Sequence, residues 1–292
     1  MELDIIYNES CYSGIKKIPD KSVDLVYIDI PYLIENGGGT KKSSVGKSIM
    51  KTFGELRGDS EKIATLEKQA KELKEKMDNT KDKKEYEKWH SQRASVLNKI
   101  NLCKADITNG IDYKLFDELE RVMKYIYIYI WCSKEQIHDI MNYWLSKKDV
   151  AFNILVWCKT NPTPACNGVW LPNLEYCLVF KQKGTPKYND GYELKSKWYM
   201  SGLNVEDKKK YEHPTIKPLE FVKQHILHST KENDIVLDCF MGSGTTAVAC
   251  KETGRHYIGF EINKEYVDIA NDRLKGITKQ DKERKERYFS LF

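Results

Sequence analysis

Two short stretches of this chain combine residue types that are suited to binding a nucleoside and acting on it. The first begins with an apolar run that ends at Asp238 and continues through Gly242 and Gly244. Such glycines let the backbone turn tightly and approach a ligand where a Cβ atom would clash. A helix that opens there directs free N–H groups and its positive dipole end at the ligand. Glu261 follows Gly242 by about 20 residues, the spacing of an acid that accepts hydrogen bonds from ribose hydroxyls. This order predicts a site for an adenosine-containing cofactor.

The second stretch is Asp29-Ile30-Pro31-Tyr32, which follows another apolar run. Pro31 fixes its own φ angle, so it presents the Ile30 carbonyl and the Tyr32 ring rigidly. A carboxylate, a fixed carbonyl and an aromatic face together suit a planar base that carries an exocyclic amine. Because ligands bind at the carboxyl ends of strands in an open parallel sheet, we expect Asp29 and Tyr32 to face the same crevice as the glycine turn.

Short apolar runs separated by helical stretches surround both motifs. The predicted strands are Val23–Asp29, Tyr125–Trp131, Ala151–Trp157, Glu175–Phe180, Asp234–Cys239 and His256–Glu261. These runs are near-continuous rather than alternating, which is typical of strands covered on both faces of a largely parallel sheet. The predicted helices are Tyr113–Lys124, Lys134–Leu145, Pro218–Ser229 and Lys264–Lys275. The alternation predicts an α/β fold with a doubly wound, mostly parallel sheet. We expect the polar segment 182–212 to be solvated surface.

One segment has a different composition, because residues 59–109 contain no Gly and no Pro and are dense in Lys and Glu. Its apolar residues step by three and four, as in a coiled-coil seam. The two sets are Ile63, Leu66, Ala70, Leu73 and Met77, then Tyr86, Trp89, Val96 and Ile100, with Arg93 at the intervening seam position. We interpret residues 55–109 as a hairpin of two antiparallel helices, inserted into an α/β domain formed by residues 1–54 and 110–292. The insertion has a role in dimerisation or in clamping a nucleic acid, or it is a solvated spacer.

Composition excludes several classes of protein. No run reaches the ~18 apolar residues of a membrane helix, and acids near the N-terminus argue against a secretion signal. The eight cysteines include no C-x-x-C pair, so we expect no metal site and a reducing, cytoplasmic location. A net charge of +5 permits nucleic-acid binding without establishing it.

Together, the tetrapeptide and the glycine turn resemble the S-adenosylmethionine-dependent DNA methyltransferases that modify amino groups, in the order of their permuted β class. Other landmarks match, namely Trp157–Pro162 ahead of Glu175, His213–Pro218, and Gly259–Asn263 with Tyr266. The chain departs from the family at Ile30, where the family usually has Pro. That Pro contributes chiefly its backbone carbonyl, which Ile30 retains, so we expect activity with less rigid positioning.

The resemblance implies a Rossmann-like methyltransferase fold and S-adenosylmethionine as the cofactor. The cofactor-binding residues that it implies are Asp238, Phe240, Gly242, Gly244, Thr245 and Glu261, with Thr215 and Lys217 at the amino-acid end. The implied catalytic residues are Asp29, Ile30, Pro31 and Tyr32. The substrate is then a base flipped out of double-stranded DNA. A second copy of the chain and a cognate restriction endonuclease are further candidate partners, and the sequence does not specify either.

Asp in the first tetrapeptide position usually accompanies adenine N6 methylation in the family, and Ser accompanies cytosine N4 methylation. Cytosine C5 methylation needs a Cys that directly follows a Pro, and none of the eight prolines has one. We therefore expect adenine N6 methylation. The alternatives are cytosine N4 methylation, methylation of RNA, a nicotinamide-dependent oxidoreductase, and a non-catalytic DNA-binding or assembly protein on a vestigial methyltransferase body.

Overall fold

The chain divides into two compact units, one formed by Met1–Ile30 with Ile111–Phe292 and the other by Pro31–Gly110. The computed structural model describes residues 1–32, 60–80, 82, 84–90, 92–93, 96, 111–162, 170–188, 191–202, 210–211, 216–282 and 284. Residues 33–59, which follow Tyr32, and the His213-Pro214-Thr215 part of the His213–Pro218 motif therefore lie outside the described residues. Within the described residues, no helix has both the length and the apolar character needed to cross a bilayer.

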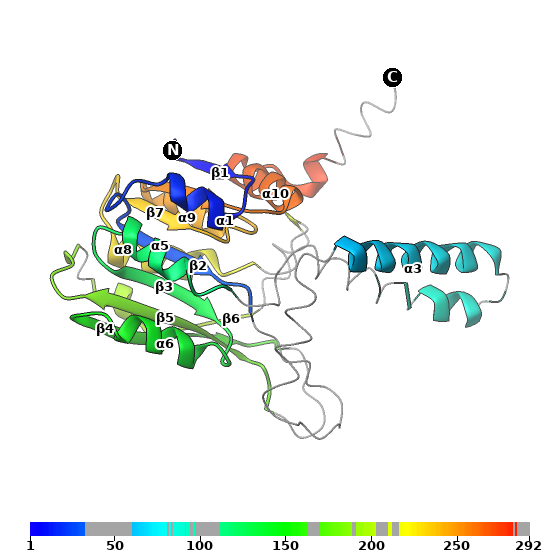
Figure 1. Ribbon diagram of the computed structural model, residues 1–292, viewed down its shortest axis with the longest axis horizontal. Helices are drawn as coiled ribbons and strands as arrows, with labels where there is room; N and C mark the ends of the chain where they lie inside the picture. Colours follow the sequence, from blue (N-terminus) through cyan, green and yellow to red (C-terminus); the bar gives the residue numbers. More distant parts are fainter. Residues whose placement is uncertain are drawn as a thin grey trace. The chain divides into compact units, whose positions relative to one another are not determined.

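One eight-stranded sheet forms the first unit, in the order β1-β8-β7-β2-β3-β5-β4-β6 (Figure 1). Its strands are β1 (Ile5–Tyr7), β2 (Leu25–Asp29), β3 (Tyr127–Cys132), β4 (Val150–Lys159), β5 (Leu174–Gln182), β6 (Trp198–Ser201), β7 (Ile235–Asp238) and β8 (His256–Phe260). All neighbouring pairs are parallel except β3–β5 and β4–β5, where β5 runs antiparallel. Because β5 is reversed, its first residues share an edge with the last residues of β2, β3, β4 and β7.

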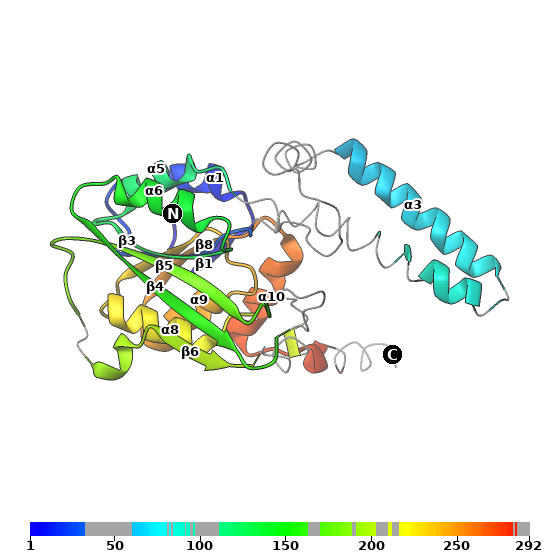
Figure 2. The same ribbon diagram turned by 90° about the horizontal axis from the view of Figure 1, so that it is seen from below.

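Alternating side chains of the central strands supply two separate cores, one on each face of the sheet. Val26, Ile28, Ile128 and Ile130 belong to the first core, whereas the flanking Tyr27, Tyr129 and Trp131 belong to the second. The first core lies under α1 (Cys11–Gly14), the 3-10 turn η1 (Ile15–Lys17), α5 (Leu115–Val122) and α6 (Ile137–Leu145). The second lies under α8 (Leu219–Ser229), α9 (Thr245–Thr253) and α10 (Lys264–Lys275). Figure 2 shows α5 and α6 on one side of the sheet and α8 on the other. Because helices cover both faces of the sheet, the side chains on both faces of the central strands are apolar, and these strands are near-continuous apolar runs in the sequence.

The predicted strands and helices are confirmed with boundary shifts of a few residues, and α10 has the predicted bounds. Two expectations were wrong. The first half of β4 is not covered on both faces, since the side chains of Phe152 and Ile154 are 42% and 38% exposed near the edge of the sheet. The segment 182–212 is not only solvated surface, because it contains β6 and a 3-10 turn η2 (Tyr192–Lys195). β6 forms because it pairs with β4, and its local sequence does not indicate a strand.

The second unit contains α3 (Ser60–Asn79) followed by helical residues 84–90, 92–93 and 96. Asp82 begins the second helix as its N-cap, because its Oδ1 accepts the N–H groups of Lys84 and Glu85 at 2.7 and 3.0 Å. Ala70 and Met77 of the predicted seam are buried. Tyr86 is not, at 45% exposed, so its assignment to the seam was wrong.

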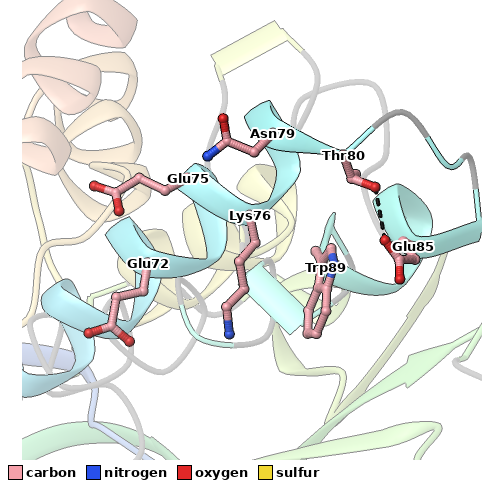
Figure 3. Close-up of a pocket in the computed structure, with 7 residues that line it drawn as sticks. All are labelled: Glu72, Glu75, Lys76, Asn79, Thr80, Glu85 and Trp89. Carbon is pink, nitrogen blue, oxygen red and sulfur yellow. Dashed lines mark hydrogen bonds between the residues drawn. The ribbon is translucent and has the colours of Figure 1, made fainter.

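An open pocket lies between α3 and the second helix, and its lining is mostly polar (Figure 3). Trp89 lies there with the Lys76 and Lys88 ammonium groups 5.0 and 4.8 Å from its ring centroid. Thr80 Oγ1 donates a 2.9 Å hydrogen bond to Glu85 Oε2 across the turn (Figure 3). These contacts join the two helices at their connected end.

Candidate active site

The glycine turn between β7 and α9 has the left-handed backbone that only glycine adopts without strain. Gly242 has φ of 50° and Gly244 has φ of 79°. A Cβ atom on Gly244 would lie 2.7 Å from the Cβ and 3.1 Å from the Cα of Ala270 on α10. Gly244 is therefore required for the close approach of α10, in addition to any approach of a ligand.

Two carboxylates hold this turn. Glu261 Oε2 accepts the N–H of Gly242 at 2.9 Å, and its Oε1 accepts the N–H of Asn263 at 2.8 Å. The backbone N–H of Ile262 also interacts with this carboxylate, and because an ionised carboxylate offers about four acceptor sites, Glu261 keeps acceptor capacity for a ribose hydroxyl. Burial raises the pKa of Glu261, although these backbone N–H bonds oppose the shift.

Asp238, at the end of β7, braces the turn from the other side. Its Oδ1 accepts the N–H of Phe240 at 2.9 Å, and its Oδ2 accepts the hydroxyl proton of Thr246 at 2.6 Å. Burial raises the pKa of Asp238 to about 7, and the negative charges of Asp29 and Glu261 add to the rise, while the two hydrogen bonds oppose it. Asp29 is thus close enough to Asp238 to be felt electrostatically.

A buried arginine that the sequence analysis did not identify ties the same turn to α10. Arg273 Nη1 donates to the Ser243 carbonyl at 2.6 Å, to Ser243 Oγ at 2.9 Å and to Thr245 Oγ1 at 3.1 Å. In the sequence, Arg273 is one basic residue of the predicted helix Lys264–Lys275, which follows the strand that ends at Glu261. Many surface arginines occupy such positions, so the sequence did not mark Arg273 as part of the site.

Asp29 lies at the end of β2, beside β7 in the sheet. From this pair of strands the chain proceeds in opposite directions, to β3 on one side and to β8 on the other, and ligands bind at such a switch point in open α/β sheets. The next residue, Ile30, is buried and donates its N–H to the Trp131 carbonyl at 3.2 Å. Pro31 and Tyr32 are partly exposed and begin the second unit.

A row of alternating charges extends from Asp29 along this edge. Lys217 Nζ lies 2.6 Å from Asp29 Oδ2 and 3.0 Å from Glu175 Oε2, and Lys159 Nζ lies 2.5 Å from Glu175 Oε1. Burial acts to raise the pKa of Glu175, but Lys217 and Lys159 outweigh it and hold this pKa at about 2. Burial acts to lower the pKa of Lys217, but Asp29 and Glu175 raise it above its ordinary value.

The structure brings together most of the residues that the sequence analysis selected. Asp238, Phe240, Gly242, Gly244, Thr245 and Glu261 surround one turn, and Asp29 and Ile30 end the neighbouring strand. Lys217 contacts Asp29, and Thr215 lies outside the described residues. The sequence analysis missed roles for Lys159, Glu175 and Trp131, although two of these belong to motifs that it singled out.

Such a turn suits S-adenosylmethionine. Gly242 and Gly244 hold the left-handed backbone of the turn, Glu261 retains acceptor capacity for a ribose hydroxyl, and α9 directs its N-terminal N–H groups toward the turn.

Comparison with known proteins identifies the family of this chain. The family model described as DNA methylase, the N6/N4 methyltransferase family, matches residues 23–272. The Type II methyltransferase M2.LlaDCHI of Lactococcus lactis subsp. cremoris is 30% identical, over 94% of this chain and 90% of its own length. The Type II methyltransferase M2.DpnII of Streptococcus pneumoniae is 28% identical, over 92% of this chain and 89% of its own length.

Two solved structures share the fold. The cytosine-N4-specific PvuII DNA methyltransferase has a TM-score of 0.56 at 14% identity and covers 92% of this chain and 85% of its own. The M1.HpyAVI–SAM complex has a TM-score of 0.51 at 23% identity and covers 92% and 98%. The predicted Rossmann-like methyltransferase fold is confirmed, and the oxidoreductase alternative is excluded. The chain belongs to the N6/N4 DNA methylase family, whose members are S-adenosylmethionine-dependent DNA methyltransferases.

Proposed function

We propose that this enzyme methylates the N6 amine of adenine in a specific sequence of double-stranded DNA. The observation that carries the proposal is the Asp29 carboxylate, held at the end of β2 beside the strand that leads into the glycine turn. Asp in this position accompanies adenine in the family that the tetrapeptide resembles. The target base is flipped out of the duplex, because its amine is inaccessible inside the stack.

Asp29 and the Ile30 carbonyl each accept one N–H of the target amine. The lone pair of a free exocyclic amine is delocalised into the ring, so the amine is a poor nucleophile. Two acceptors draw the nitrogen toward tetrahedral geometry and localise its lone pair for in-line attack. Asp29 accepts a hydrogen bond first, and the proton leaves during or after methyl transfer. Stacking of the base on Tyr32, held by Pro31, recovers about 1–3 kcal/mol of the flipping energy.

The cofactor site that we propose is the turn between β7 and α9. Glu261 holds the ribose hydroxyls, Asp238 and the backbone from Phe240 to Thr245 contact the methionine portion, and Thr215 with Lys217 completes the amino-acid end. When bound, the cofactor supplies an electrophilic methyl group on a positively charged sulfur. The ion pairs of Lys217 support an additional role, which is argued below.

We further propose that the enzyme works in the cytoplasm as a homodimer beside a cognate restriction endonuclease. The designation of its relatives as Type II methyltransferases supports a restriction partner. The helical hairpin of α3 with residues 84–90, 92–93 and 96 lies within the second unit and supports self-association, because these helical residues carry nearly equal numbers of basic and acidic side chains.

Expression in a methylation-free host tests the proposed reaction. Mass spectrometry of digested DNA should detect N6-methyladenine, and N4-methylcytosine alone would contradict the adenine assignment. Methylated RNA with unmodified DNA would contradict DNA as the substrate.

The matched variants are Asp29→Ala and Asp20→Ala, since Asp20 is an exposed carboxylate that is ion-paired with Arg121. Asp29→Ala should lower the rate by about 10²–10³ and preserve cofactor affinity, because one pre-organised hydrogen bond at the reacting nitrogen is lost. Asp20→Ala should behave as wild type. An Asp29→Ala enzyme with more than half of the wild-type turnover would refute the role of Asp29.

A further inference from the structure

Four side chains of alternating charge cross the carboxyl edge of the sheet in one row: Lys159, Glu175, Lys217 and Asp29. They come from β4, from β5, from the segment before α8 and from β2. The first three are only 12–16% exposed, and Asp29 is 34% exposed. Ions so poorly hydrated are stable only when they are paired, so each member of the row depends on its neighbours.

The Trp131 ring lies beneath Lys217 in this row. Trp131 is fully buried, and its backbone pairs with Asp29 across β2 and β3. The Lys217 ammonium lies 5.0 Å from the centroid of its ring. Trp131 Nε1 donates to Tyr27 Oη at 2.8 Å, and Tyr27 Oη lies 3.1 Å from Nδ1 of the buried His225. The surface under Lys217 is therefore fixed by the core, and the lysine has one place to lie.

We propose that Lys217 is a positioning residue that orients Asp29 and keeps it ionised, and that Glu175 is the counter-charge that holds Lys217 in place. This inference rests on the proposed function, in which Asp29 accepts a hydrogen bond from the target amine. An ionised carboxylate accepts on both oxygens, whereas a protonated carboxyl group donates at one of them. Lys217 on Oδ2 also fixes the rotation of the group and hence the direction of Oδ1.

The charges around Asp29 give the expected sign. Besides Lys217, the titratable groups among the described residues that interact with Asp29 include Tyr27, Cys132, Cys177 and Asp238. Burial raises the pKa of Cys132 to about 12 and those of Tyr27 and Cys177 well above their ordinary values, so these three stay neutral. Without Lys217, the row would hold two carboxylates, Glu175 and Asp29, against one cation, Lys159, so the ionised form of Asp29 would be disfavoured.

The test compares variants of Lys217 in two measurements. The first is the pH dependence of the single-turnover methylation rate, and the second is the titration of the Asp29 carboxyl group by ¹³C NMR in the protein without substrates, assigned with Asp29→Asn. Lys217→Met should move the acid limb and the Asp29 midpoint upward by at least about one pH unit. Lys217→Arg should restore both, and Lys217→Gln replaces Lys217→Met if the latter does not fold.

Glu175→Gln distinguishes an effect of charge in the row from an effect of side-chain packing. It removes the counter-charge that holds Lys217 in place but keeps the Lys217 cation, so both midpoints should lie between those of wild type and Lys217→Met. The double variant with Lys217→Met again balances the row and should return the midpoint at least halfway to wild type. Lys223→Met is the matched control, because Lys223 also pairs with two carboxylates, Glu220 and Glu252, on the outer surface of α8. It should change neither measurement.

Cofactor affinity, measured by calorimetry, distinguishes this role from a purely cofactor-binding one. Because Lys217 is also placed at the amino-acid end of the cofactor, Lys217→Met can weaken S-adenosylmethionine binding; the positioning role predicts that the Asp29 midpoint moves as well, and a tenfold loss of affinity with an unchanged Asp29 midpoint would overturn it. An unchanged midpoint in both variants would also overturn it. A wild-type enzyme that leaves DNA unmethylated would refute the proposed function, while the NMR midpoints would still decide the effect of Lys217 on Asp29.

Discussion

Replacement of Gly244 by alanine should destabilise the fold more than the same change at two other glycines of equal backbone conformation. Gly244, Gly254 and Gly276 have φ of 79°, 73° and 72°. A left-handed conformation costs alanine about 1–2 kcal/mol, and all three variants carry that cost. Only at Gly244 would the new Cβ meet immovable atoms, the Cβ and Cα of Ala270 at 2.7 and 3.1 Å. Overpacking of this kind costs about 1–3 kcal/mol more.

The two control sites isolate the steric part of the effect. A Cβ atom on Gly254 would lie no closer than 3.6 Å to Glu232, and one on Gly276 has nothing within 4 Å. We therefore expect a loss of about 2–5 kcal/mol in the free energy of unfolding for Gly244→Ala and about 1–2 kcal/mol for each control. Urea titrations without cofactor measure these differences directly, with thermal midpoints as a second readout.

The comparison also has a functional readout. A shift of α10 away from the turn would displace the Arg273 and Glu261 contacts that hold it, so Gly244→Ala should also weaken S-adenosylmethionine binding. If Gly244→Ala is no less stable than Gly254→Ala and Gly276→Ala, the argument from close packing against Ala270 is wrong. Equal losses of cofactor affinity in all three variants would contradict the local role of the turn.

Three further predictions follow from the site, the core and the hairpin. Glu261→Ala should weaken S-adenosylmethionine binding, because the ribose loses its acceptor and Gly242 loses its hydrogen bond, and unchanged calorimetric affinity would remove Glu261 from the site. Burial, with a smaller contribution from His228, lowers the pKa of His225 from 6.5 to about 3. The unfolded chain then binds a proton that the folded state excludes, so stability should fall as pH decreases from 6.5 toward 3, and His225→Phe should flatten that slope in urea titrations. Replacing residues 59–105 by a Gly/Ser linker should preserve cofactor affinity. It should either weaken DNA binding at least tenfold, about 1.4 kcal/mol, or convert a dimer to a monomer. If neither DNA titration nor light scattering shows a change, the hairpin is a spacer.

Elements with local signals could be predicted from the sequence, and elements that depend on distant partners could not. α10 carries its own boundaries, since the Asn263 side chain accepts the Glu265 N–H at 2.9 Å and Gly276 ends the helix at φ of 72°. The antiparallel direction of β5 had no such signal, because a continuous apolar run has the same composition in either direction. β6 is short and lies in a polar segment, and its pairing with β4 is its main support.

The candidate site divides in the same way. The glycine turn and Glu261 lie within one strand–helix–strand unit, so their spacing alone indicated a nucleoside site. The ion pair of Lys217 with Asp29 joins residues 188 positions apart and depends on the strand order. Glu175 reaches the same edge only because β5 is reversed. Residue types could suggest these partners, but only the sheet topology could pair them.

The position of β2 at the centre of the sheet has a consequence for synthesis on the ribosome. β2 is among the first segments to emerge, but its neighbours β3 and β7 follow about 100 and about 200 residues later, which at about 5–20 residues per second is roughly 5–20 s and 10–40 s. During that interval an almost wholly apolar strand has neither of its neighbours, so the nascent chain exposes an aggregation-prone edge. The strand that carries Asp29 can pair on both sides only after β7 has emerged, late in translation. A truncated chain would therefore be prone to aggregation and unable to act on the DNA of its own host.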